Sequence, residues 1–474
     1  MSGIPVPDVV VVLPGITGSV LAKDGREVWA PTPGALFHAV LGLGRPVKQL
    51  QIVADDDWKA PDLGDGITAT RIMPDVHLIP GLWKIDGYGG LERFLLETFD
   101  LTPGDNYFAF AYDWRRDNRA SAKRLQESCN SWVQRWREKS GNTAARLVFV
   151  CHSMGGLVAR YFVEVLEGWR ITRAVITFGT PFYGSLNAVE FFVNEVSKGL
   201  GPLRIDLTPL VRSLTSARQL VPSYRCIDLP EGSAAIPNRD VLPGWQAAWD
   251  APAKEFVEEL EEAARRNREE PSFAADPVVY RPIVGTDQPT LQSAEVRGDK
   301  VELLFHRGGS DEGGDGTVPL LSAALSGTED QRTFAPQQHA RLQAYDPMLD
   351  HLKGVLTALY HVRIEDLRRV MTSWFSYRGD DVYLSGEPVA VELAARSSLD
   401  EDLLPVVEAT ITVTNRMNGQ QVLTMAARVP RESQRFELGT LPAGTYLVEV
   451  SGRRDTAPVS DVIVVAPPDE AVEE

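Results

Sequence analysis

The fold is decided by the stretch Arg146-Leu147-Val148-Phe149-Val150-Cys151-His152-Ser153-Met154-Gly155-Gly156-Leu157-Val158. Its first half is apolar and rich in β-branched residues up to Cys151, which is typical of a buried parallel strand. Beyond the glycines, apolar residues recur at helical spacing from Leu157 to Val165. Ser153 is therefore expected on a tight turn between a strand and a helix.

A serine on such a turn is held in a strained conformation with its hydroxyl pointing outward, as in the pattern G-x-S-x-G. Gly155 supplies the second glycine, and Cys151 replaces the first with a side chain that is still small. The N–H of Met154 opens the helix, so we expect it to stabilise a developing oxyanion. We expect the neighbouring His152 to contact substrate. The alternative is a strand-turn-helix unit that contains a serine without using it.

Composition restricts the classes of protein that this chain can represent. The 474 residues carry a formal net charge of −17, which argues against a nucleic-acid partner. The three cysteines, Cys129, Cys151 and Cys226, suggest neither a disulfide framework nor a metal site. Because we recognise neither a signal peptide nor an apolar run of the roughly 18 residues that a membrane span needs, we expect a soluble cytoplasmic protein.

A second element of the site is expected near the N-terminus. Val9–Leu13 is apolar enough for a fully buried strand, and it leads into Pro14-Gly15-Ile16. A glycine-rich turn after an early strand exposes backbone N–H groups, so we assign the second oxyanion donor to Ile16 and a substrate contact to Gly15. A plain turn that ends the strand is an equally good interpretation.

Polar residues also follow the expected strand Tyr107–Tyr112. A polar cluster beyond the carboxyl end of a strand is where α/β proteins build their sites. We therefore expect Asp113 and Trp114 to bind substrate.

Two residues are expected to complete a catalytic triad with Ser153. Asp315 lies in the glycine-rich run from Gly308 to Pro319, which could aim one carboxylate inward. A Ca²⁺ loop is the competing interpretation, but the spacing of the acids does not fit an EF-hand. His339 falls between the expected last strand and last helix, whereas His351 falls inside that helix. The order serine, aspartate, histidine is typical of α/β-hydrolases.

The expected fold is an α/β-hydrolase domain over residues 1–378, with a mostly parallel central sheet and helices on both faces. Between about 186 and 276 the alternation of strand and helix breaks down, which predicts an inserted cap. In the cap, Lys254–Arg268 fits either a surface lid or a peripheral helix. Apolar runs at 36–41 and 78–83 could meet a lipid surface or be buried.

A second module is expected over residues 379–468. Short alternating runs separated by turn residues predict an immunoglobulin-like or transthyretin-like β-sandwich. We find no acid–base or metal constellation there, so its expected role is docking or spacing, with a protein partner as one candidate. The acidic tail 469–474 is expected to be disordered.

The motifs together resemble the lecithin:cholesterol acyltransferase-like family, which includes lysosomal phospholipase A-type enzymes. In chain order they are Leu13-Pro14-Gly15-Ile16-Thr17-Gly18-Ser19, Tyr112-Asp113-Trp114-Arg115, His152-Ser153-Met154-Gly155-Gly156, Gly179-Thr180-Pro181, Gly314-Asp315-Gly316-Thr317-Val318 and Gln338-His339. The resemblance implies a serine hydrolase or acyltransferase that acts on lipid esters. It implies Ser153 as nucleophile, His339 as base and Asp315 as its orienting group, with the N–H groups of Ile16 and Met154 as oxyanion hole. This chain departs from the secreted members, which carry a signal peptide and a disulfide-closed lid.

The expected substrate is therefore a lipid or other acyl ester, with transient contact to a membrane surface, no cofactor and no metal. Two alternatives stay open. One is a soluble carboxylesterase or deacylase without lipid preference. The other is an inactive hydrolase scaffold that acts as an interaction protein.

Overall fold

The computed structural model describes most of the chain: residues 3–30, 48–53, 56–74, 77–79, 83–85, 87–194, 197–198, 205–229, 232–360, 373–397, 406–452 and 456–467. The apolar run at 36–41, residues 80–82 of the second apolar run and the acidic tail 469–474 lie outside these ranges.

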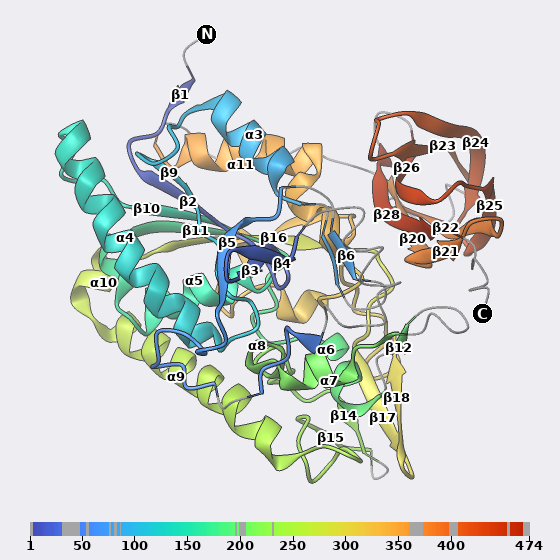
Figure 1. Cartoon of the computed structure of the whole chain (residues 1–474), viewed down its shortest axis with the longest axis horizontal. Helices are drawn as coiled ribbons and strands as arrows, with labels where there is room; N and C mark the ends of the chain where they lie inside the picture. Colours follow the sequence, from blue (N-terminus) through green and yellow to red (C-terminus); the bar gives the residue numbers. More distant parts are fainter. Residues whose placement is uncertain are drawn as a thin grey trace.

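A six-stranded parallel sheet forms the centre of the molecule (Figure 1). Its strand order is β19-β16-β11-β10-β2-β9, and every neighbouring pair is parallel. The strands are β2 (Val9–Leu13), β9 (Tyr107–Ala109), β10 (Leu147–His152), β11 (Thr172–Phe178), β16 (Val279–Gly285) and β19 (Thr333–Ala335). Because β10 has neighbours on both sides and helices above and below, every residue of it is buried. The strand expected at Tyr107–Tyr112 ends earlier, at Ala109.

Helices cover both faces of this sheet, which confirms the expected α/β-hydrolase fold (Figure 1). On one side lie α4 (Asn118–Ser140) and α5 (Gly155–Glu164), and on the other lie α3 (Gly89–Thr98) and α11 (Asp346–Ala358). The longest of them, α4, begins where the side chain of Asp117 accepts from the N–H of Arg119, and ends at Gly141 in a left-handed conformation.

The segment between β11 and β16, where the sequence predicts an inserted cap, contains the remaining described α-helices. They are α6 (Leu186–Val193), α7 (Thr208–Ser213), α8 (Thr215–Arg218), α9 (Asp250–Glu269) and α10 (Pro271–Ala275). A four-stranded sheet of order β15-β14-β17-β18 joins β14 (Ile227–Asp228) and β15 (Ala234–Ala235) to β17 (Ser293–Arg297) and β18 (Lys300–Leu304). The chain returns to the central sheet at β16, and β17 then pairs with β14 of the preceding segment.

Helix α9 is a peripheral helix rather than a lid over the described site. Its Phe256 stacks on Tyr161 of α5 with ring centroids 5.5 Å apart. Farther along, the amide of Asn267 donates to the carboxylate of Glu164 (2.8 Å). Its narrow apolar stripe thus packs on α5 at the side of the domain. This agrees with the interpretation as a peripheral helix, one of the two that the sequence allowed.

Short elements complete this part of the chain. They are β1 (Ile4–Pro5), β3 (Ser19–Lys23), β4 (Arg26–Trp29), β5 (Ile67–Ile72), β6 (His77–Ile79), β7 (Trp83–Ile85), β8 (Phe99–Asp100), β12 (Ser197–Lys198), β13 (Ile205–Asp206), η1 (Gly168–Ile171), η3 (Ala247–Trp249), η4 (Leu320–Ser322), η5 (Glu329–Gln331) and η6 (His339–Ala344). Within the described ranges, no helix has both the length and the apolar character that crossing a bilayer would require. The three cysteines are free and buried.

Two antiparallel-rich sheets form the C-terminal β-sandwich, with orders β25-β22-β20-β27 and β21-β28-β26-β23-β24. The strands are β20 (Ser373–Gly379), β21 (Val382–Leu384), β22 (Pro388–Ser397), β23 (Val406–Asn415), β24 (Gln421–Pro430), β25 (Gln434–Thr440), β26 (Gly444–Ser451), β27 (Thr456–Ala457) and β28 (Val459–Ala466). The sandwich begins before the expected residue 379. The reason is that Phe375 and Tyr377 of β20 belong to its core, which is separate from that of the central sheet.

Candidate active site

Ser153 lies on the turn between β10 and α5 in a left-handed backbone conformation, with φ of 52°. Such a conformation costs a residue other than glycine about 1–2 kcal/mol. Two bonds hold the turn in place: the N–H of Ser153 donates to the carbonyl of Phe178 (2.9 Å), and its own carbonyl accepts from the hydroxyl of Thr180 (2.9 Å). The turn lies at the carboxyl edge of the sheet, where open α/β folds bind their ligands.

The side chains of Ser153, His339 and Asp315 form one hydrogen-bonded row. The Nε2 atom of His339 lies 2.9 Å from Oγ of Ser153, and its Nδ1 atom lies 2.7 Å from Oδ2 of Asp315. Because an ionised carboxylate only accepts hydrogen bonds, Nδ1 carries the hydrogen and Nε2 accepts from the serine hydroxyl. The structure thus brings together the three residues that chain order selected.

Backbone groups orient the carboxylate of Asp315. Its Oδ1 atom accepts from the N–H groups of Thr317 (2.9 Å) and Val318 (2.6 Å), which leaves Oδ2 for His339. The carbonyl of Asp315 also accepts from the N–H of His339 (2.8 Å). Asp315 is 1% exposed, so its position is set by these bonds rather than by water.

The geometry around position 179 explains why the motif Gly179-Thr180-Pro181 begins with a glycine. It has a φ of 58°, and a Cβ atom placed there would lie 2.8 Å from Oδ2 of Asp315 and 2.9 Å from Nδ1 of His339. Any side chain would therefore disturb the pair formed by the carboxylate and the imidazole.

The N-terminal loop lies against the serine. A Cβ atom on Gly15 would come within 2.9 Å of the Cβ atom of Ser153, so the glycine permits the close approach. In the part of the chain that the structure describes, neither the N–H of Ile16 nor that of Met154 has a hydrogen-bond acceptor. N–H groups without an internal acceptor are what an oxyanion hole requires.

His152 supports the site from behind, together with a tyrosine that the sequence did not single out. The hydroxyl of Tyr88 accepts from the N–H of Gly15 (2.7 Å) and donates to Nδ1 of His152 (3.0 Å). The Nε2–H of His152 in turn donates to the carbonyl of His339 (3.0 Å). This chain of bonds joins the Gly15 loop to the histidine loop, so its contacts indicate a positioning role for His152 rather than substrate binding.

Burial keeps His152 neutral. It is 1% exposed, and desolvation, aided by the nearby His339, lowers the pKa of its imidazole to about 3. A neutral ring offers one donor and one acceptor, which is what its two partners require. No sequence signal marks Tyr88, because its role arises only when a loop folds back onto residues far away in the chain.

Asp113 and Trp114 do not lie among the reacting groups, contrary to expectation. The carboxylate of Asp113 accepts from the guanidinium of Arg115 (2.9 and 2.6 Å). Trp114 is fully buried, and its Nε1–H donates to the carbonyl of Ser19 (3.2 Å). The polar side chains after β9 therefore have hydrogen-bond partners within the protein.

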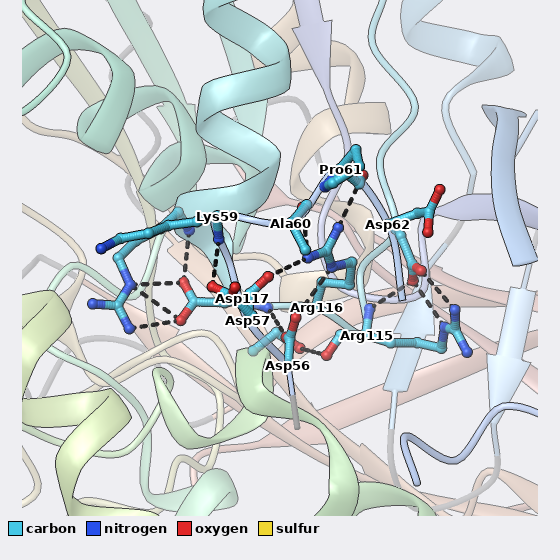
Figure 2. Close-up of polar contacts among 12 residues, drawn as sticks. Asp56, Asp57, Lys59, Ala60, Pro61, Asp62, Arg115, Arg116 and Asp117 are labelled. Atoms are coloured by element: carbon cyan, nitrogen blue, oxygen red, sulfur yellow. Dashed lines mark hydrogen bonds and ion pairs between the residues drawn. The ribbon is translucent and has the colours of Figure 1, made fainter. Parts of the chain in front are cut away.

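The neighbouring Arg116 holds the loop at 56–61 against the segment that precedes α4 (Figure 2). Its guanidinium donates to the carboxylate of Asp56 (3.1 Å) and to three backbone carbonyls, those of Asp57 (3.0 Å), Ala60 (3.1 Å) and Pro61 (3.1 Å). A planar fork with five donors suits such multiple binding. The cluster thus has a structural role, and a dense polar run was a misleading signal for a site.

The acids of the loop before Asp315 have partners of their own. Glu312 pairs with Arg307 (2.8 Å), and the carboxylate of Asp311 accepts from Gln292 and from the N–H of Gly313. Among the described residues, no group of three or more His, Cys, Asp or Glu side chains is arranged to hold a metal ion. This loop serves to present Asp315.

Comparison with known proteins agrees with the resemblance inferred from the motifs. Residues 94–261 match the family model of lecithin:cholesterol acyltransferase, which confirms that expectation for the segment containing Ser153. An uncharacterized protein of Saccharomyces cerevisiae is 28% identical over 174 residues, or 36% of this chain, and the match spans only 23% of the yeast protein.

Two solved structures align over nearly the whole chain. Lipase BlEst2 of Bacillus licheniformis, in its propeptide form, is 12% identical with a TM-score of 0.32, and the alignment covers 98% of this chain and 95% of that one. Phospholipase PlaB from Legionella pneumophila is 9% identical with a TM-score of 0.33, and the alignment covers 97% and 90%.

Proposed function

We propose that this chain, of which residues 94–261 match lecithin:cholesterol acyltransferase, is a serine hydrolase or acyltransferase of lipid esters. The observation that carries the proposal is the row of hydrogen bonds from Ser153 through His339 to Asp315, with distances of 2.9 and 2.7 Å. Such a row supports nucleophilic attack by a serine whose proton passes to an imidazole.

In the first step, Oγ of Ser153 bonds to the carbonyl carbon of the ester while Nε2 of His339 takes the hydroxyl proton. The negative charge that forms on the carbonyl oxygen is stabilised by the N–H groups of Ile16 and Met154. The loss of one such donor typically reduces the rate by a factor of about 10²–10³. Collapse of the intermediate expels the alcohol, which takes the proton from His339, and leaves an acyl group on Ser153.

In the second step, water or an acceptor alcohol attacks the acyl-enzyme. His339 removes the proton of the incoming hydroxyl and returns it to Oγ of Ser153 when the product acid or ester leaves. Asp315 keeps Nδ1 protonated and stabilises the imidazolium that forms in both steps. The choice between water and an alcohol decides between hydrolysis and acyl transfer.

The test compares the native protein with Ser153→Ala and with Ser140→Ala, in which an exposed serine of α4 is replaced. Each is labelled with a fluorophosphonate probe and incubated with a mixed lipid extract that is analysed by mass spectrometry. Labelling and lipid turnover by the native protein and the Ser140→Ala variant, and their loss in Ser153→Ala at unchanged circular dichroism, would support the proposal. Labelling retained by Ser153→Ala would overturn the assignment of the nucleophile.

The same three proteins, assayed in addition on short soluble esters, distinguish the alternatives. Turnover of short soluble esters but not of lipids would favour a soluble esterase. A native protein that is neither labelled nor active on any ester would indicate an inactive scaffold.

A further inference from the structure

The loops that carry Asp315 and His339 are attached to the C-terminal sandwich by glutamine side chains. Gln288 follows β16 and is 2% exposed. Its Nε2–H donates to the carbonyl of Phe375 (3.2 Å), and its Oε1 accepts from the N–H of Tyr377 (3.2 Å). The side-chain amide thus bonds to β20 as a neighbouring strand would, next to the positions at which β27 pairs with the same strand.

The backbone of Gln288 is at the same time part of the support of Asp315. Its N–H donates to the carbonyl of Gly314 (3.0 Å), and Gln288 forms a β-bridge with Asp315. Two residues further on, the hydroxyl of Thr290 accepts from the N–H of Gly316 (2.8 Å). Gln288 therefore connects β20 of the sandwich directly to the loop that presents the carboxylate.

His339 is attached from both of its sides. Before it, the Nε2–H of Gln338 donates to the carbonyl of Tyr377 (2.9 Å). After it, the Nε–H of Arg341 donates to the hydroxyl of Ser460 in β28 (2.9 Å). The histidine loop thus has contacts with strands of both sheets of the sandwich.

Gln337 adds a further contact at the same place. Its buried Oε1 atom accepts from the N–H of Ser460 (3.2 Å) and from the N–H of Gln338 (2.8 Å). Two consecutive glutamines therefore fix the backbone that leads into His339. Residues 336–338, between the end of β19 at Ala335 and the start of η6 at His339, belong to no helix or strand.

From these contacts we propose that the β-sandwich is a positioning element of the active site, and that Gln288 and Gln338 are positioning residues that hold Asp315 and His339 in register with Ser153. The inference rests on the proposed function for its catalytic consequence. Its physical basis is the narrow tolerance of such sites, in which catalytic groups must be held to within about 0.5 Å. The loop before Asp315 is rich in glycine and lacks long regular elements, so contacts to a rigid sheet provide the missing constraint.

The variants are Gln288→Met and Gln338→Met, which keep the length of the side chain and remove its amide. Gln126→Met is the matched control, because the amide of Gln126 on α4 also donates to a backbone carbonyl, that of Leu166 (2.9 Å), away from the site. Gln338 is only partly buried, so its variant is the safer one for folding. Thermal unfolding and circular dichroism verify that each protein is folded.

We expect kcat to fall at least about tenfold in each of the two site variants, with KM changed by less than about twofold, because misplaced catalytic groups slow the chemical step. Gln126→Met should leave both constants unchanged. Site variants that are folded and as active as the control would overturn the inference, whereas a native protein without ester turnover would overturn the proposed function.

A second readout does not depend on turnover. The proton between Nδ1 of His339 and Asp315 should give a low-field proton resonance in NMR spectra, assigned by its loss in His339→Gln. We expect this resonance to shift or broaden in Gln288→Met and Gln338→Met and to stay in place in Gln126→Met. An unchanged resonance in both site variants would overturn the positioning role, whether or not the protein is an esterase.

Discussion

Replacing His152 should remove a specific part of the pH dependence of stability. In the folded protein the pKa of this buried imidazole is lowered from its usual 6.5 to about 3, mainly by desolvation and also by the nearby His339. The unfolded chain therefore binds a proton at His152 below pH 6.5, and the folded protein does not. Stability associated with this residue is fully present above pH 6.5 and is lost as the pH falls toward 3.

The expected loss of stability follows from the width of the pH interval in which only the unfolded chain is protonated at His152. Each pH unit below 6.5 lowers the free energy of unfolding by about 1.4 kcal/mol, so about 2 kcal/mol is lost between pH 7 and pH 5 through His152 alone. The variant His152→Gln keeps a donor toward the carbonyl of His339 but does not titrate. The native protein should therefore lose about 2 kcal/mol more than the variant over this interval.

The assay is urea-induced unfolding at pH 7 and pH 5, followed by tryptophan fluorescence and by circular dichroism. His152→Asn serves as a second non-titrating variant that keeps an acceptor toward Tyr88 instead of the donor, and it should show the same reduced pH dependence. Equal losses of stability in the native protein and in both variants would refute the reasoning, because His152 would then bind a proton as readily in the folded state as in the unfolded one.

Three further changes test other parts of the site. Asp315→Asn should keep the fold but lower kcat by a factor of about 10²–10⁴, because an amide no longer fixes the imidazole tautomer; steady-state kinetics and thermal unfolding measure the two effects. Gly179→Ala should reduce both activity and stability, whereas Gly298→Ala, at a similar φ of 62° with nothing within 4 Å, should show only a backbone cost of about 1–2 kcal/mol in urea unfolding. Tyr88→Phe leaves a buried N–H without its acceptor, so it should cost about 1–3 kcal/mol of stability and lower kcat more than it raises KM.

The sequence predicts those parts of the site that have a local pattern. Ser153 could be found because a buried strand, small residues and a helical repeat meet within a dozen positions. Asp315 and His339 could be selected from chain order and from their loops, and the structure places them in a row with Ser153. The central sheet is equally predictable, since its strands are continuous apolar runs.

The errors have a common physical cause: local sequence does not reveal which partner a side chain has. Asp113 is a polar residue at the end of a strand, as a site residue would be, but Arg115 takes up its carboxylate. At Lys254–Arg268 the sequence left a lid and a peripheral helix open, and only the packing of its stripe on α5 decides between them. Tyr88 and Gln288 have no charge or motif, and their partners lie 73 and 89 residues away at Gly15 and Tyr377, so only the folded chain reveals them.

The contacts that hold the loop of His339 are of two kinds. His152, Gln337 and Gln338 contribute neutral hydrogen-bonding groups, and Arg341 contributes a guanidinium that donates to the hydroxyl of Ser460. The glutamine amides and the imidazole of His152, which burial keeps neutral, orient the loop through hydrogen bonds alone. In the described geometry Asp315 contacts the imidazole itself, whereas the neighbouring residues hold the backbone that carries it, so the orientation of the ring and the placement of its loop depend on different residues.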